Sequence, residues 1–192
     1  AFPHKVRVEE ALESVQQSVQ RCKVITHRLL GFAHQTEVKI EELDINVLLR
    51  EVIDFLAEEA SYSRIRIVFD LGLSIDSIYS DRGELLQVFL NITSNAIDAL
   101  GSDGEITLRS RQLDDATVRV SISDNGPGMS EEVQRQIFDP FFTTKETGQG
   151  TGLGLSIVYG LVRKLGGTIN VVSAVNEGAS FEIDLPIRQE TV

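Results

Sequence analysis

The sequence contains a single cysteine, Cys22, among its 192 residues. An internal disulfide needs two cysteines and a thiolate metal site needs several, so both are excluded within this chain. A lone thiol is compatible with a reducing cytosol, and we expect the chain to be cytoplasmic. The sequence also has no run of about 18 apolar residues, which argues against a membrane-spanning helix. Any anchor that ties the intact protein to a membrane would be encoded elsewhere.

Cationic residues are scarce, with 18 Lys and Arg against 29 Asp and Glu and a formal net charge of −11. Nucleic acid and anionic membrane surfaces both require cationic patches, so we expect neither as a direct partner. The chain starts at Ala1 without an initiator methionine or a signal-peptide pattern. We therefore expect it to be a piece of a longer protein.

The first 37 residues carry the pattern of a long helix. Mainly apolar residues recur there at alternating steps of four and three, at Val8, Leu12, Val15, Val19, Cys22, Thr26, Leu29 and Ala33. Such a seam is typical of a coiled coil or a four-helix bundle, and one helix cannot bury it alone. We expect a partner helix either from a second copy or from the segment upstream of Ala1, and we expect the intact protein to be a homodimer through this helix. The alternative is a helix packed on the globular domain of its own chain.

Residues 38–192 are long enough for one globular domain. Periodicity predicts helices over 47–60, 82–100, 130–137 and 156–165, and strands over 65–69, 78–79, 104–112, 117–124, 168–173 and 179–185. Residues 36–43 show no pattern and are predicted to form a hinge. Helices interspersed among sequentially paired strands, without repeating βαβ units, favour a two-layer α+β fold.

The third predicted helix carries both a start signal and a polar face. Asp81 and Glu84 have the spacing of a capping box, in which the Asp accepts from an early helical N–H and the Glu reaches back. Gln87, Asn91, Asn95 and Asp98 then recur at steps of four, four and three. Amides one turn apart suit a hydrated Mg²⁺ and a phosphate, because Mg²⁺ prefers oxygen ligands and keeps several waters. By itself, this pattern equally describes a solvated polar face.

Two glycine-rich stretches, which we call the glycine boxes, follow the strand that ends at Asp124. The first holds Gly126 and Gly128, where missing side chains let a backbone turn sharply and a flat ligand approach closely. The second, residues 150–155, opens a helix whose first N–H groups can bind anionic oxygens. The first box suits the edge of a base and the second suits phosphates, so the two together would fit a nucleotide.

These stretches resemble the ATP-binding domain of the bacterial sensor histidine kinases, within the wider ATPase group of gyrase, the mismatch-repair ATPases and the ninety-kilodalton chaperone. The glycine boxes are shared across that group. Residues 138–145, Phe-Asp-Pro-Phe-Phe-Thr-Thr-Lys, are more specific and resemble the phenylalanine box of histidine kinases, closest to the nitrogen-regulation-type branch. Residues 91–96 resemble the asparagine box. The match covers roughly 44–187, and residues 1–37 look like the second helix of the dimerisation and phosphoacceptor domain.

The resemblance implies a mixed sheet covered on one face by three helices, with ATP between the helices and a lid over residues 145–150. Asp124 would accept a hydrogen bond from the exocyclic amine of adenine, Asn95 would coordinate Mg²⁺, and Lys145 would meet the γ-phosphate. The predicted nucleotide-binding residues are Asn91, Asn95, Asp124, Gly126, Gly128, Lys145, Gly150, Thr151, Gly152, Leu153 and Gly154, with Asn95 and Lys145 also catalytic. Asp98 is left out of the site, because many relatives carry Lys at that position.

The sequence lacks a recognisable phosphoacceptor. In the resembled family the acceptor is a mid-helix histidine followed by an acidic residue. None of His4, His27 and His34 is followed by one. We therefore expect the acceptor helix to lie upstream of Ala1 in the intact protein.

The leading hypothesis is the catalytic part of a two-component sensor histidine kinase. It would transfer the γ-phosphoryl group of Mg-ATP to a histidine, for relay to an Asp on a response regulator receiver domain. One alternative is an anti-sigma-type serine kinase of the same fold, which residues 138–145 and the heptad helix disfavour. Another is an ATP-binding scaffold without kinase activity, in which nucleotide only adjusts pairing with a partner.

Overall fold

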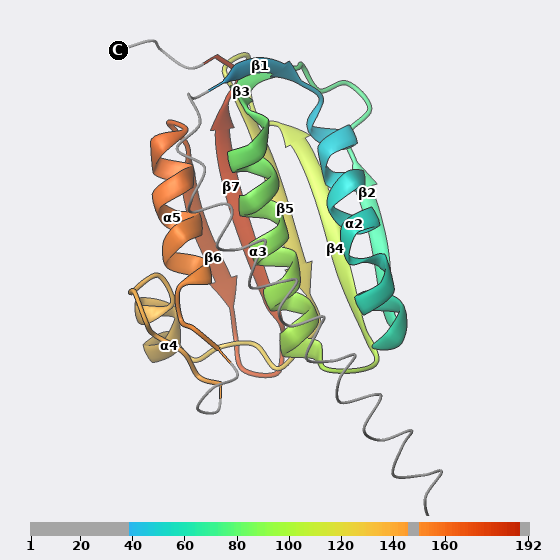
Figure 1. The fold of residues 1–192 in the computed structure, drawn as a ribbon, viewed down its shortest axis with the longest axis vertical. Coiled ribbons are helices and arrows are strands. Elements are labelled where there is room, and N and C mark those ends of the chain that lie inside the picture. The colour runs from blue at the N-terminus through green and yellow to red at the C-terminus, as the bar shows by residue number, and fades with distance from the viewer. Residues whose placement is uncertain (1–38, 146–149, 189–192) are drawn as a thin grey trace, which may run out of the picture. The chain divides into compact units, whose positions relative to one another are not determined.

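The computed structural model describes residues 39–145 and 150–188, which belong to the second of two compact units, Lys39–Val192. The predicted N-terminal helix over residues 1–37 lies outside the described residues, so the domain boundary after residue 37 stays a prediction. Within the second unit, a five-stranded sheet is covered on one face by α2, α3 and α5 (Figure 1). This arrangement confirms the predicted two-layer α+β fold.

The helices are α2 (Ile45–Tyr62), α3 (Arg82–Leu100), α4 (Glu131–Gln136) and α5 (Gly154–Lys164). The strands are β1 (Ile40–Leu43), β2 (Ile65–Leu71), β3 (Ile78–Asp81), β4 (Gly104–Gln112), β5 (Thr117–Asp124), β6 (Thr168–Ser173) and β7 (Ala179–Pro186). In the larger sheet the order is β2-β4-β5-β7-β6, with β2 and β4 parallel and the other pairs antiparallel. β1 and β3 form a separate antiparallel pair.

Alternation along the strands sends apolar side chains to the helix-covered face and polar ones to the opposite face. In β5, Val118, Val120 and Ile122 are buried, and Arg119 on the opposite face pairs with Asp184 of β7. The buried side of α3, which includes Leu85, Phe89 and Ile92, is part of the same core. The side chain of Asp124 shares the helix-covered face with Ile122, because the two residues are two positions apart on one strand.

α3 begins and ends where the sequence predicts, but only half of the predicted capping box forms. The Asp81 side chain accepts a hydrogen bond from the Glu84 N–H at 3.0 Å, and Gly101 closes the helix at φ 66°. Glu84 does not reach back to the cap residue. Its carboxylate instead pairs with Lys164 at the end of α5. The competing partner is a full positive charge, which holds a carboxylate more strongly than a neutral backbone N–H does.

The predicted patternless hinge over residues 36–43 is wrong in its second half, because Ile40–Leu43 forms β1. Its four residues are too few to show a clear alternation, and the strand depends on a partner far away in the sequence, β3. Among the described residues, no helix is long and apolar enough to cross a membrane.

The Asp81 cap generates a stability prediction. Asp81→Ala should lower the free energy of unfolding by about 1 kcal/mol, because the Glu84 N–H loses its acceptor. Asp81→Asn keeps an acceptor oxygen and should retain most of the stability. Urea denaturation followed by circular dichroism measures both variants. Equal stabilities for the parent and Asp81→Ala would show that the cap contributes nothing.

Candidate functional site

The predicted site residues gather at one end of the sheet, which we call the glycine-box end. Here α3 and β5 end while α5 and β7 begin, at the lower end of the domain in Figure 1. Adenine-, metal- and phosphate-binding roles were predicted from separate stretches of sequence. The fold brings those stretches to the same end of the helix-covered face.

Asp124 is the last residue of β5 and is partly buried. Its Oδ1 accepts a hydrogen bond from the Gly126 N–H at 2.9 Å, which turns the chain sharply out of the strand. Burial raises the pKa of this carboxyl, and backbone hydrogen bonds from Gly126 and Ala179 oppose the rise. A partly buried carboxylate oxygen at a strand end is suited to accept a hydrogen bond from a neutral amine.

The β6–β7 turn packs directly against the first glycine box. A Cβ on Gly178 would lie 2.0 Å from the Asp124 carbonyl oxygen, and a Cβ on Gly128 would lie 1.9 Å from the Ala174 carbonyl oxygen. Both glycines have positive φ, 78° and 64°. Only a residue without a side chain fits either position, so these two glycines bring the turn and the box together. Gly126 is also tight, since its Cβ would lie 2.8 Å from Asp124 Oδ1.

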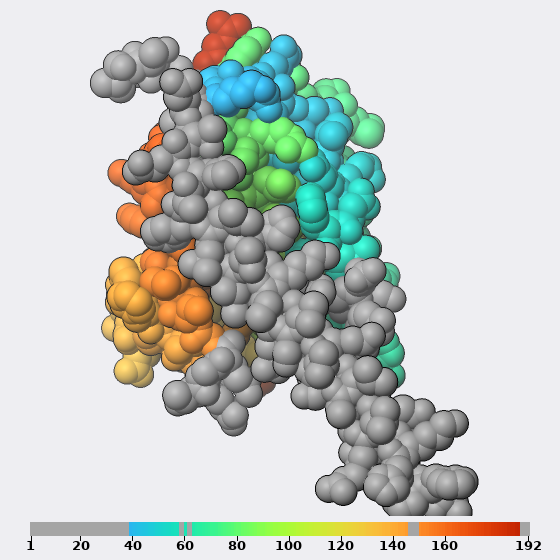
Figure 2. Space-filling model, in the orientation of Figure 1, coloured from blue at the N-terminus to red at the C-terminus, as the bar shows by residue number. Residues whose placement is uncertain are grey.

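The second glycine box is tied to the phenylalanine box through the backbone. The Phe141 N–H donates to the Gly152 carbonyl at 2.9 Å, and a Cβ on Gly152 would lie 2.4 Å from the Phe141 carbonyl carbon. Phe141 has a positive φ of 67°, a strained conformation for an aromatic residue. The Phe138 ring lies 5.4 Å from the Tyr159 ring of α5. Figure 2 shows α4 and α5 forming one continuous surface on this face.

The start of α5 lies beside Asn95 of α3. The cap residue Leu153 makes no side-chain capping bond, and a Cβ on Gly154 would lie 3.8 Å from Asn95 Nδ2. Asn95 is partly exposed, whereas Asn91, one turn earlier, is only 7% exposed. Gly150 and Gly152 are partly buried, while the Thr151 side chain is exposed. A helix start without a side-chain cap, next to an accessible amide, can hold an anion together with its cation.

Lys145 is the last residue of the phenylalanine box, and its ammonium group forms an ion pair with Asp98 of α3. This contact adds Asp98, which the sequence analysis left out, to the surroundings of the site. Residues 146–149 of the predicted lid lie outside the described residues.

Asp98 had one signal in the sequence, its position three residues after Asn95 on the same helix face. Gly178 had a weaker one, its place directly before the strand predicted over 179–185, where a turn is expected.

The donor set fits a magnesium ion that is held mainly by a nucleotide. Among the described residues, no group of three or more His, Cys, Asp or Glu side chains is arranged to bind a metal ion. Asn95 has one side-chain carbonyl, and its amide group lies beside the start of α5. Mg²⁺ is commonly bound by one or two protein oxygens together with substrate phosphates and water. The chain can therefore supply part of such a shell but not all of it.

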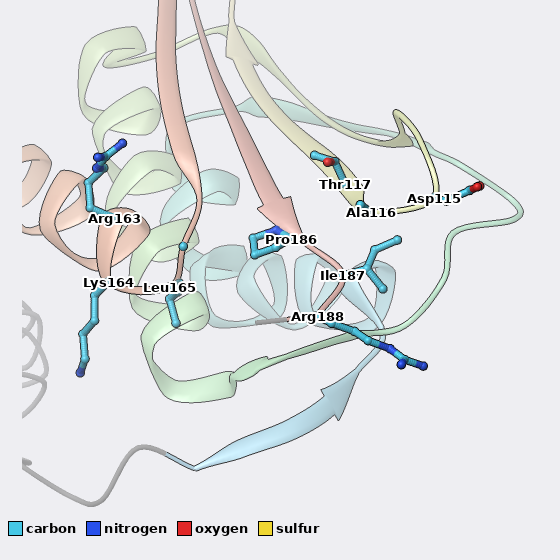
Figure 3. Close-up of a pocket in the computed structure, with 10 residues that line it drawn as sticks. Asp115, Ala116, Thr117, Arg163, Lys164, Leu165, Pro186, Ile187 and Arg188 are labelled. Atoms are coloured by element: carbon cyan, nitrogen blue, oxygen red, sulfur yellow. The ribbon is translucent and has the colours of Figure 1, made fainter. Parts of the chain in front are cut away.

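A cleft of about 690 Å³ lies at the other end of the domain and is a different place (Figure 3). It is lined by the end of α5, the start of β5 and the end of β7, whereas the predicted site lies at the opposite ends of these elements. Arg163, Lys164 and Arg188 point in different directions around it. Because these cations do not converge, the cleft lacks the geometry of an anion site.

Comparison with known proteins identifies relatives of this domain. Residues 80–189 match the family model described as histidine kinase-, DNA gyrase B-, and HSP90-like ATPase. Sensor kinase CckA of Brucella abortus is 35% identical over 187 residues, covering 90% of this chain and 20% of its own length. The signal transduction histidine-protein kinase AtoS of Escherichia coli is 32% identical over 182 residues, covering 95% and 30%. The chain thus spans less than a third of either relative.

Solved structures agree with these matches. The catalytic domain of histidine kinase ThkA, in a nucleotide-free form, is 36% identical with a TM-score of 0.70, covering 78% of this chain and 97% of that one. Full-length ShkA in complex with AMPPNP has a TM-score of 0.74 at 28% identity, covering 97% and 39%. ThkA in complex with the response regulator protein TrrA has a TM-score of 0.74 at 27% identity, covering 97% and 52%.

The raised pKa of Asp124 generates a pH prediction. An unfolded Asp ionises near pH 3.9, whereas the folded, partly buried carboxyl keeps its proton to a higher pH. Between the two pKa values the folded state binds more protons, so stability falls as pH rises, and the penalty persists at neutral pH. Asp124→Asn removes this penalty and should be more stable than the parent at pH 7.

Urea denaturation of both chains between about pH 3 and pH 7 measures the effect. The advantage of Asp124→Asn should shrink toward the acid end, where the parent carboxyl is protonated in both states. Asp54→Asn, at an exposed position on α2, controls for the change in net charge. A variant that is less stable than the parent at pH 7 would contradict the prediction.

Proposed function

From the premise that this chain belongs to the histidine kinase-, DNA gyrase B- and HSP90-like ATPase family, we propose that it binds Mg-ATP at the glycine-box end. Within that family it is the catalytic domain of a bacterial sensor histidine kinase. We further propose that it transfers the γ-phosphoryl group to a histidine on an upstream helix. A response regulator Asp would receive the group next. The branch we propose is the nitrogen-regulation-like one, on the strength of residues 138–145.

The observation that carries this proposal is the meeting of three elements at one end of the sheet. Asp124 ends β5, Asn95 lies on α3, and Gly154 opens α5 beside that asparagine. Asp124 would accept the adenine amine, with Gly126 and Gly128 allowing the ring to approach. Gly150, Thr151, Gly152, Leu153 and Gly154 would surround the phosphates, with Asn91 alongside. The AMPPNP bound to ShkA supports a nucleotide as the ligand.

Phosphoryl transfer depends on positioning and on charge stabilisation rather than on covalent chemistry by the protein. When bound, Mg²⁺ would neutralise charge that develops on the phosphate oxygens. In this chain, Asn95 would supply a carbonyl ligand to the ion. Lys145 would bring its ammonium near the transferring oxygens, where charge accumulates in the transition state.

The partners of the intact protein are part of the proposal. The heptad pattern of residues 1–37 supports a homodimer through that helix. The complex of ThkA with TrrA supports a response regulator as the downstream partner. The requirement for ATP favours a cytoplasmic location for this chain, whether or not the parent protein is anchored in a membrane. The net charge of −11 disfavours nucleic acid and direct membrane contact.

Nucleotide binding is the first property to test. The parent chain should bind Mg-ATP, and Asp124→Asn should bind it at least tenfold more weakly, a loss of about 1.4 kcal/mol. The reason is that an amide offers the adenine amine a weaker acceptor than a carboxylate does. Isothermal titration calorimetry measures both affinities, with Asp54→Asn as the control. Equal affinity in Asp124→Asn would remove Asp124 from the adenine pocket.

Transfer is tested separately by supplying the acceptor. The parent chain is mixed with a histidine-bearing helical domain of a sensor kinase and γ-labelled ATP. We expect acid-labile label on that domain and a large loss of label with Lys145→Met, because the transferring oxygens lose a cation. Label on a serine would favour the anti-sigma-type kinase. Tight binding with no transfer to any acceptor would favour the scaffold.

A further inference from the structure

The ion pair between Lys145 and Asp98 joins two residues that the proposed function treats differently. Lys145 is the candidate for the γ-phosphate, whereas Asp98 carries a negative charge that a phosphate would repel. Their side chains are 35% and 37% exposed, so solvent screens the pair only partly. Asp98 lies one turn after Asn95 on the same face of α3. The ammonium of Lys145 is therefore held beside the proposed metal ligand.

The local backbone directs Lys145 toward this contact. Its N–H donates to the Thr143 hydroxyl oxygen at 3.1 Å, which orders the turn before the lysine. A Cβ on Gly150 would lie 2.8 Å from that hydroxyl oxygen and 3.2 Å from Lys145 Cδ. Gly150 therefore leaves the space that the lysine side chain occupies on its way to Asp98.

The position of Asp98 explains why it needs a cation. Asp98 lies in the last turn of α3, where the helix dipole places partial negative charge. The last turn contains no basic residue to offset it. Lys145 supplies the missing positive charge from another part of the chain. The pair is consequently favourable in the free protein, by the modest amount expected for a partly exposed ion pair.

We propose that Asp98 is a positioning residue that holds Lys145 in the nucleotide-free chain and releases it to the γ-phosphate of ATP. This inference rests on the proposed function. Binding of ATP then requires that one ion pair be broken, whereas ADP lacks the γ-phosphate and leaves the pair intact. Asp98 thereby lowers the affinity for ATP relative to ADP, and it keeps the lysine at the site between turnovers.

A double-mutant cycle tests this exchange. Calorimetry measures the binding of AMPPNP and of ADP, each with saturating Mg²⁺, to the parent, Asp98→Asn, Lys145→Met and the double variant. Asp98→Asn should bind AMPPNP more tightly than the parent does. That gain should be about two- to fivefold larger with Lys145 present than in the Lys145→Met background, since only the lysine forms a pair that binding must break.

The same variants separate this inference from its competitors. The affinity for ADP should change less than about twofold in Asp98→Asn, and Asp98→Glu, which can still pair, should stay within about twofold of the parent for AMPPNP. Asp54→Asn makes the same change in net charge on α2 and should leave both affinities unchanged. Equal gains in the two backgrounds, with and without the lysine, would overturn the exchange, because Asp98 would then act by charge repulsion alone.

Two further outcomes would also overturn it. Weaker AMPPNP binding in Asp98→Asn would show that Asp98 supports the phosphates or the metal. If Asp98→Asn binds AMPPNP more weakly, or if the gains are equal with and without the lysine, ADP binding by the parent would still support the proposed nucleotide site. Failure of the folded parent to bind either nucleotide would instead refute the proposed function, and the inference with it.

Discussion

The close approach of the β6–β7 turn to the end of β5 is the constraint on which the site depends. Asp124 and Ala179 are paired in the antiparallel register, and Gly178 precedes the pair with a φ that side chains rarely adopt. Any side chain at Gly178 would collide with the Asp124 carbonyl. Without this approach, the Asp124 carboxyl would lose the Ala179 N–H and would turn toward solvent. The last strand of the chain thus positions a residue that lies far earlier in the sequence.

The burial that suits the Asp124 carboxylate to bind a ligand also lowers the stability of the folded chain. A desolvated carboxyl has a raised pKa, which means that its charged form is destabilised in the folded chain. A ligand that donates a hydrogen bond to this carboxylate offsets part of the lost hydration. The free protein therefore carries a penalty that binding relieves, and Asp124→Asn should separate the two effects by raising stability while weakening affinity. Functional sites commonly give up stability in this way.

The sequence predicted local features better than contacts between residues that lie far apart along the chain. Both strands of the β4–β5 hairpin were predicted with the observed ends, because alternation and turn residues are local signals. β1 was missed, since its four residues are too few to show alternation and their pairing partner, β3, lies far along the chain. The Asp81 cap was predicted, but the partner of Glu84 was wrong because Lys164 lies eighty residues away. Asp98 was left out of the site because many relatives carry Lys at that position, and its ion pair with Lys145 has no signature in either stretch alone.

The two ends of α3 illustrate how one helix can be fixed at one end and responsive at the other. Glu84 lies in the first turn, where the helix dipole favours an anion, and its carboxylate pairs with Lys164 of α5. The helix dipole and the Lys164 ammonium group both stabilise the Glu84 carboxylate, and the ion pair ties α3 to the end of α5. Asp98 lies in the last turn, where the dipole disfavours an anion, and its side chain is 37% exposed against 17% for Glu84. A γ-phosphate beside Asn95 would compete with the Asp98 carboxylate, which the helix dipole already disfavours, for the ammonium group of Lys145. Lys145 would then exchange partners, while the Glu84–Lys164 pair keeps α3 fixed to α5.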